Sequence, residues 1–145
     1  MILLDVNVLI YAFRQDADRH AEFRDWLRQR RVESQPFGMA ELVLAAFVRI
    51  VTNARIFREP DSLNDALRFT TAVQSSPNLV KVVPGPRHWE IFTGLCREVS
   101  ARGNLVADAY LAALALESGT TWITTDRDFA RFPGLRWRHP LDPVQ

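Results

Sequence analysis

Residues 105–116 read LVADAYLAALAL, a segment that is apolar on nearly every side when it is wound at the helical period. A helix of this kind packs against neighbours on most of its faces. Its one charged residue is Asp108, and charged groups are rarely buried unless they are paired or bind a metal. Asp108 therefore either lies in the first turn, where it complements the helix dipole, or has a partner elsewhere in the chain.

Composition limits the class of protein. The chain has 145 residues, of which 48% are hydrophobic, and this predicts one globular domain over residues 1–145. No apolar run is long enough to span a membrane, and the start of the chain lacks the basic region of a signal peptide. The single cysteine, Cys96, excludes an internal disulfide and fits the reducing cytoplasm, where we expect the protein to reside.

The positive charge is carried almost entirely by arginine. The net charge is only +1, and Lys81 is the one lysine of the chain. Arginine is the planar, bidentate ligand of phosphate groups, but a genome that favours arginine codons explains the bias as well. Composition therefore permits a nucleic-acid partner without establishing one.

Strand and helix patterns alternate along the chain. Apolar or β-branched runs predict strands at residues 2–4, 79–83, 120–125 and 135–137, whereas Pro36-Phe37-Gly38 predicts only a break. Amphipathic patterns predict helices at residues 8–13, 16–31, 40–53, 61–75 and 87–101, in addition to the segment at 105–116. This alternation predicts an α/β fold with a mainly parallel central sheet between layers of helices. Ligands of such sheets bind beyond the carboxyl ends of the strands.

Acidic residues recur at that edge of the predicted sheet. Asp5 ends the first strand, and Asp126 and Asp128 follow the strand at 120–125. Glu41 and Asp108 are expected in the first turns of helices, which begin at the same edge. Each acid alone has a capping explanation, but the core requires none of them, so the set as a whole predicts a shared site.

Mutual repulsion of these acids has a chemical consequence. Two carboxylates about 5 Å apart repel by roughly 3 kcal/mol at an effective dielectric constant of about 20. Four of them either take up protons or bind a cation, and an all-oxygen site suits Mg²⁺ or Mn²⁺. Zinc is disfavoured because the three histidines and one cysteine have no ligand spacing. A carboxylate-held metal ion can activate water for attack on a phosphodiester.

Four pieces of the sequence together resemble a known family. They are LDVNVL at residues 4–9, Glu41, Asp108, and TTDRDF at residues 124–129. In this order and spacing they resemble the PIN-domain family, and more closely the VapC ribonuclease toxins of type II toxin–antitoxin systems. The resemblance spans essentially the whole chain, with no departure at the acidic positions.

The resemblance implies a three-layer α/β/α sandwich and an endoribonuclease that depends on Mg²⁺, for which Mn²⁺ substitutes. The substrate it implies is structured RNA, such as a tRNA or ribosomal RNA loop, and the partners are a VapB-type antitoxin and a second copy of the chain. The implied metal-site acids are Asp5, Glu41, Asp108 and Asp126, with Asp128 as a fifth candidate and Asn7 and Thr125 as polar neighbours. Arg14, Arg49, Arg127 and the exposed tryptophans are candidates for RNA contacts.

Two other functions compete with this interpretation. One is a different Mg²⁺-dependent phosphoesterase, but a phosphatase of the haloacid type would carry an aspartate where this chain has Asn7. The other is a non-catalytic binding module with the same fold. The loss of at least one acid would be expected in such a module, and all four are present.

Overall fold

The computed structural model describes residues 1–143. All four pairings between neighbouring strands are parallel, and the strand order in the sheet is β3-β2-β1-β4-β5. The strands are β1 (Ile2–Leu4), β2 (Phe37–Met39), β3 (Leu79–Lys81), β4 (Thr121–Ile123) and β5 (Trp137–Arg138). The predicted parallel α/β sheet is confirmed.

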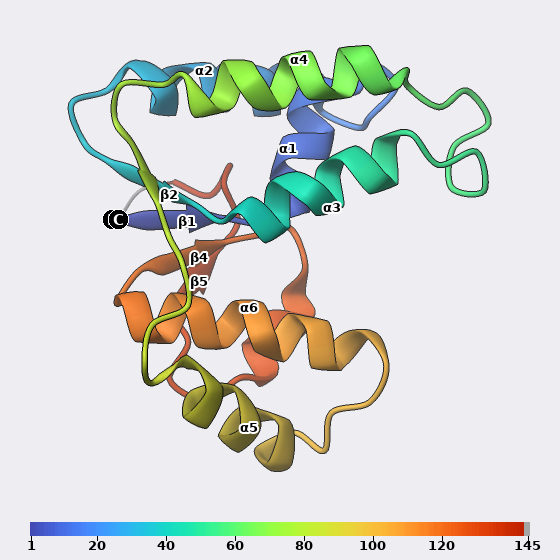
Figure 1. Cartoon of the computed structure of the whole chain (residues 1–145). Helices are drawn as coiled ribbons and strands as arrows, with labels where there is room; N and C mark the ends of the chain where they lie inside the picture. The colour runs from blue at the N-terminus through green and yellow to red at the C-terminus, as the bar shows by residue number, and fades with distance from the viewer. Residues whose placement is uncertain (144–145) are drawn as a thin grey trace.

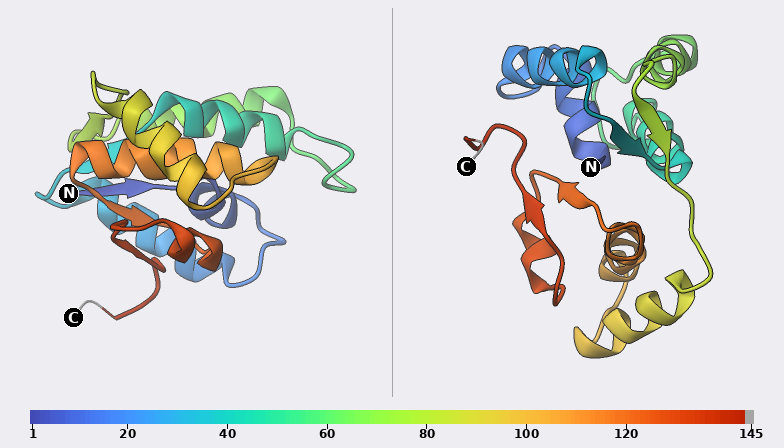
Figure 2. Two further views of the ribbon diagram at one scale, coloured as in Figure 1. Left: turned by 90° about the horizontal axis from the view of Figure 1, so that it is seen from below. Right: turned by 90° about the vertical axis from the view of Figure 1, so that its left-hand side faces the viewer.

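Six α-helices flank the sheet in the described part of the chain, as expected of an α/β/α sandwich. In Figure 1, α1 to α4 lie above the strands and α5 and α6 lie below them. Figure 2 shows from two further sides that α5 covers the outer side of α6. The helices are α1 (Val6–Phe13), α2 (His20–Val32), α3 (Glu41–Val51), α4 (Leu63–Gln74), α5 (His88–Glu98) and α6 (Asn104–Ser118), and a short 3₁₀ helix, η1 (Arg127–Arg131), follows β4. None of the helices within residues 1–143 has the length and apolar character that crossing a membrane requires.

The connectivity places a crevice at one position of the sheet edge. From the central strand β1 the chain adds β2 and then β3 on one side, and it afterwards crosses to β4 and β5 on the other side. The order therefore reverses between β1 and β4. Ligands of open α/β sheets bind beyond the carboxyl ends of the strands at such a switch point.

Helix α6 is buried over only part of its length. Its alanines and Leu114 are buried from Ala109 onward, and their small side chains let the helix lie close to the sheet. Its first turns extend past the carboxyl ends of the strands, as does α3 (Figure 1), and Val106 is exposed there. The prediction of packing on most sides is thus correct for the carboxyl-terminal part of α6 and wrong for its beginning.

Strand β2 was not predicted, because Pro36 and Gly38 are typical of a break in secondary structure. Gly38 instead allows close packing within the sheet. A Cβ atom at this position would lie 2.9 Å from Val82 Cγ2 and 3.1 Å from the Ile2 carbonyl oxygen. Only glycine lets β2 lie between β1 and β3 at this distance.

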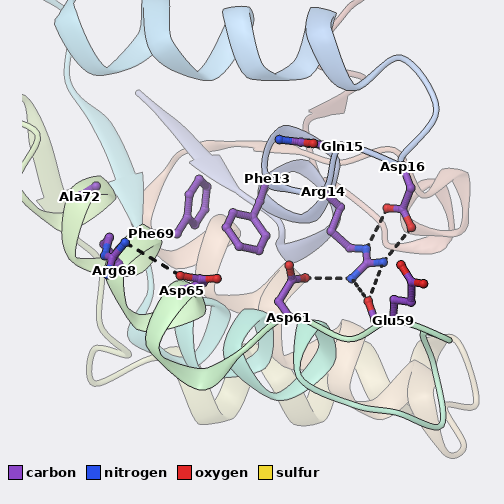
Figure 3. Close-up of a pocket in the computed structure, with 10 residues that line it drawn as sticks. All are labelled: Phe13, Arg14, Gln15, Asp16, Glu59, Asp61, Asp65, Arg68, Phe69 and Ala72. Carbon is purple, nitrogen blue, oxygen red and sulfur yellow. Dashed lines mark hydrogen bonds and ion pairs between the residues drawn. The ribbon is translucent and has the colours of Figure 1, made fainter.

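Arg14 organises the loop before α2 instead of contacting solvent. Helix α2 begins at His20 and not at residue 16 as predicted, because residues 14–19 form a turn around this arginine. The buried guanidinium donates to Asp16 at 2.7 and 2.9 Å, to Asp61 Oδ2 at 2.8 Å and to the Glu59 carbonyl at 3.3 Å (Figure 3). It also stacks on the Phe57 ring at 3.7 Å. Arg14 therefore has a structural role, and its buried guanidinium is already engaged by these partners, which disfavours it as a candidate for RNA contact.

We expect Arg14→Lys to lower the free energy of unfolding by about 2 kcal/mol, because an ammonium group cannot make the forked contacts with two carboxylates. Urea denaturation of the purified proteins measures this loss. The matched control is Arg24→Lys, since Arg24 forms an exposed ion pair with Asp25. That change should cost less than about 0.5 kcal/mol, and an equal loss in both variants would contradict the structural role of Arg14.

Candidate active site

Asp5 is the most rigidly held acid at the switch point. It follows β1 directly, its side chain is only 4% exposed, and it caps α1. Its Oδ1 accepts from the Val6 backbone N–H at 2.7 Å, and its Oδ2 accepts from Asn7 Nδ2 at 3.0 Å and from Thr124 Oγ1 at 2.6 Å. Burial raises the pKa of this carboxyl from 3.8 to about 6, even though the hydrogen bonds from Thr124 and Val6 oppose the shift.

Thr124 connects the polar residues around Asp5, a role that was not predicted from the sequence. Besides donating to Asp5, its fully buried hydroxyl accepts from Asn7 Nδ2 and from the Asp126 backbone N–H, both at 3.0 Å. Among residues 1–143, the predicted neighbour Thr125 contributes only its backbone N–H, which donates to Asn7 Oδ1 at 3.2 Å. The strand register explains the position of Thr124. Leu4 of β1 pairs with Ile123 of β4, so Asp5 and Thr124 directly follow paired residues on adjacent strands.

Asp108 and Asp126 lie close enough to Asp5 to perturb it electrostatically. Both charges raise the pKa of Asp5 further. The pKa of Asp108 is itself raised, first by partial burial and then by the charges of Asp126 and Asp128. Asp108 is the fifth residue of α6 and not a first-turn residue, so the interpretation that it complements the helix dipole is wrong.

Glu41 occupies a different position from these aspartates. It begins α3 as predicted, but its side chain is 60% exposed and forms an ion pair with Lys81 at the end of β3. Asp128 is also exposed, and its backbone N–H donates to Asp126 Oδ1 at 2.8 Å. Three of the four predicted acids, Asp5, Asp108 and Asp126, thus lie in one cluster. Asp128 is near enough for its charge to affect Asp108, whereas Glu41 is paired with Lys81 outside the cluster.

The three aspartates lie in a groove of about 970 Å³ between α3 and α6. One wall is the outward face of α3, and the other is formed by the start of α6 with Phe92 of α5. Both walls are largely apolar. The lining residues include Asp5, Asn7, Leu42, Arg49, Ile50, Ile56, Phe92, Asn104, Val106, Asp108, Tyr110 and Asp126.

The donor chemistry of this cluster fits a hard cation. Within residues 1–143, Asp5, Asp108 and Asp126 form no ion pair with an arginine, lysine or histidine. Their charges are therefore not compensated by a side chain, and carboxylate oxygens are the ligands that Mg²⁺ and Mn²⁺ prefer. In the same part of the chain, however, no three Asp, Glu, His or Cys side chains are arranged to hold one ion between them.

Comparison of the sequence with known proteins identifies a family. Residues 2–135 match the PIN domain. The chain is similar to ribonuclease VapC43 of Mycobacterium tuberculosis, with 49% identity over 142 residues that cover 98% of this chain and 97% of the relative. It is also similar to ribonuclease VapC25 of the same organism, with 41% identity over 140 residues that cover 97% and 99% of the two chains.

Solved structures show the same fold at low sequence identity. VapBC-1 from nontypeable Haemophilus influenzae matches with a TM-score of 0.69 and 17% identity, covering 98% of this chain and 100% of that one. VapC20 from Mycobacterium tuberculosis, described as a toxin that cleaves the sarcin-ricin loop, matches with a TM-score of 0.64 and 16% identity, covering 94% and 99%. These structures confirm the PIN-like α/β/α sandwich.

We expect Asp108→Asn to raise the melting temperature of the metal-free protein at pH 7, by roughly 2–4 °C, because it removes one of the mutually repelling charges. The raised pKa fixes the sign of the pH dependence: the charged carboxyl destabilises the fold above its folded pKa, and this effect disappears as the pH falls below 3.8. Thermal melts of both proteins between pH 4 and pH 7 in EDTA measure the difference.

The control for this prediction is Asp18→Asn, which changes an exposed aspartate outside the cluster. It should leave the melting temperature within about 1 °C of wild type. A lower melting temperature for Asp108→Asn than for wild type would show that Asp108 is stabilising where it lies, and would contradict the repulsion described above.

Proposed function

Since the chain belongs to the PIN-domain family and is related over nearly its whole length to VapC ribonucleases, we propose that it is an endoribonuclease that requires Mg²⁺ or Mn²⁺ and acts as the toxin of a VapBC-type pair. The observation that supports this most strongly is the uncompensated cluster of Asp5, Asp108 and Asp126 in a groove at the switch point. Structured RNA, such as a tRNA or ribosomal RNA loop, is the proposed substrate.

Each acid has a distinct role in this proposal. Asp5 is a fixed ligand, since three hydrogen-bond donors hold its two oxygens in place. Asp108 and Asp126 complete the carboxylate set from α6 and from the turn after β4. A divalent ion bound by these oxygens would lower the pKa of a coordinated water and offset charge on the phosphate oxygens.

The other predicted residues have supporting roles. Asn7 and Thr124 orient the Asp5 carboxylate, and Thr125 fixes Asn7 through its backbone. Glu41 remains a proposed metal-site acid, although binding an ion with the aspartates requires it to leave Lys81. Asp128 remains a fifth candidate for the metal site, because its negative charge raises the pKa of Asp108.

The proposed partners follow from the family. Several structures of the same fold are complexes described as VapBC, including one from Rickettsia felis bound to a promoter DNA fragment. We therefore propose a VapB-type antitoxin and a homodimer for this chain. A cytoplasmic location is part of the same proposal.

The purified protein should cleave RNA with Mg²⁺ or Mn²⁺ and lose this activity in EDTA. Asp108→Asn should slow cleavage by more than roughly 100-fold, because loss of residues that merely support a ligand already costs 10–100-fold. Gel analysis of a labelled mixture of total RNA measures the rates.

Asp18→Asn is the matched control and should retain the wild-type rate, since Asp18 lies outside the groove. Cleavage that persists in EDTA, or a fully active Asp108→Asn protein, would refute the metal-dependent mechanism. A protein with all its acids that cleaves no RNA under any of these conditions would instead favour the non-catalytic binding module.

A further inference from the structure

The groove that contains the three aspartates has one cationic side chain among its described lining residues, Arg49 on α3. We propose that Arg49 binds a backbone phosphate beside the one that is cleaved, and so holds the RNA across the acidic cluster. This inference rests on the proposed ribonuclease function and assigns a substrate-binding residue within the same groove.

Arg49 lies on the outward face of α3, on the same stripe as Leu42 and Ala45. This helix extends past the carboxyl ends of the strands (Figure 1), and Arg49 is seven residues beyond Leu42, or about 10 Å along the axis. Arg49 therefore lies on the part of α3 that is farther from the strands, and it lines the groove there. A nucleotide strand bound along the groove would pass both it and the aspartates.

The charge of Arg49 is available for a ligand. The side chain is exposed, and within residues 1–143 it forms neither an ion pair nor a side-chain hydrogen bond to another residue. Of the other two arginines considered from sequence, Arg14 is buried in its own network, and Arg127 does not line the groove. The structure thus selects one of three candidates that the sequence could not rank.

The positive charge of Arg49 can offset the electrostatic repulsion between the acidic cluster and RNA. The three carboxylates repel the phosphates of an approaching RNA, and a planar cation in the same groove offsets that repulsion and can contact a phosphate through two N–H groups. The opposite wall contributes the rings of Phe92 and Tyr110, which pack edge to face with centroids 5.6 Å apart. An unpaired base can stack on aromatic rings, so both walls suit an unpaired strand.

The test measures RNA binding separately from cleavage. Fluorescence anisotropy of a labelled, unpaired RNA of mixed sequence is recorded in EDTA, with every protein carrying Asp108→Asn to prevent cleavage. Adding Arg49→Met should weaken binding by about 10-fold and reduce the slope of log K against log salt concentration by about 0.7, the value for one phosphate contact on a single strand. Arg49→Lys, which keeps the charge, should recover part of the affinity.

The matched control is Arg28→Met on α2, an exposed arginine outside the groove, which should change the affinity by less than about twofold. In proteins that keep Asp108, Arg49→Met should raise KM more than it lowers kcat in the presence of Mg²⁺.

The outcomes separate this inference from the proposed function. If the wild-type protein cleaves RNA but Arg49→Met has an unchanged salt slope and an unchanged KM, the role of Arg49 is refuted and the ribonuclease function stands. If the wild-type protein neither binds nor cleaves RNA, both are refuted. An equal loss in Arg28→Met would show a general effect of net charge and would also overturn the assignment to Arg49.

Discussion

The burial of one carboxylate between two adjacent strands governs the arrangement of this site. Asp5 directly follows β1, and Thr124 directly follows the adjacent strand β4. A hydrogen bond from Thr124 Oγ1 to Asp5 Oδ2 joins the two strand ends. Removing the carboxylate from water raises its pKa from 3.8 to about 6, a cost of roughly 3 kcal/mol at neutral pH. This net shift remains after the hydrogen bonds from Thr124 and Val6 have lowered the pKa. At neutral pH the negative charge of the buried Asp5 carboxylate therefore destabilises the fold, and a bound cation would offset this effect.

The rest of the architecture brings further negative charge to the same point. The reversal of strand order between β1 and β4 opens the crevice, η1 after β4 positions Asp126, and α6 crosses the edge so that Asp108 faces the cluster. The small alanines of α6 let its carboxyl-terminal part pack tightly, which fixes the direction of its exposed first turns. Rigid packing at one end of this helix thus determines where a carboxylate lies at the other end.

The sequence was sufficient to predict the features of the fold and the site that depend on local pattern. Apolar runs and helix periodicity identified most elements, and the position of acids after strands and at helix starts indicated the edge where they gather. It was insufficient where a residue acts through a neighbour that is distant in the chain. In the sequence, Gly38 is typical of a break in secondary structure, and its role in a strand depends on the close packing against Val82 and the Ile2 carbonyl. The role of Thr124 likewise depends on the pairing of β4 with β1. Glu41 lies where the pattern predicted, but its side chain interacts with Lys81, a pairing that depends on strand order.

In the proposed function, Asp5, Asp108 and Asp126 bind one cation together. Electron paramagnetic resonance measures this binding most directly, because free Mn²⁺ gives a strong signal in solution that decreases when the ion binds to protein. At pH 7 the wild-type protein should reduce the free Mn²⁺ signal, excess Mg²⁺ should restore it, and Asp108→Asn should bind at least 10-fold more weakly, as the loss of a ligand requires. Equal Mn²⁺ binding by the wild-type and Asp108→Asn proteins, or no binding by the wild type, would show that the three aspartates do not share a cation.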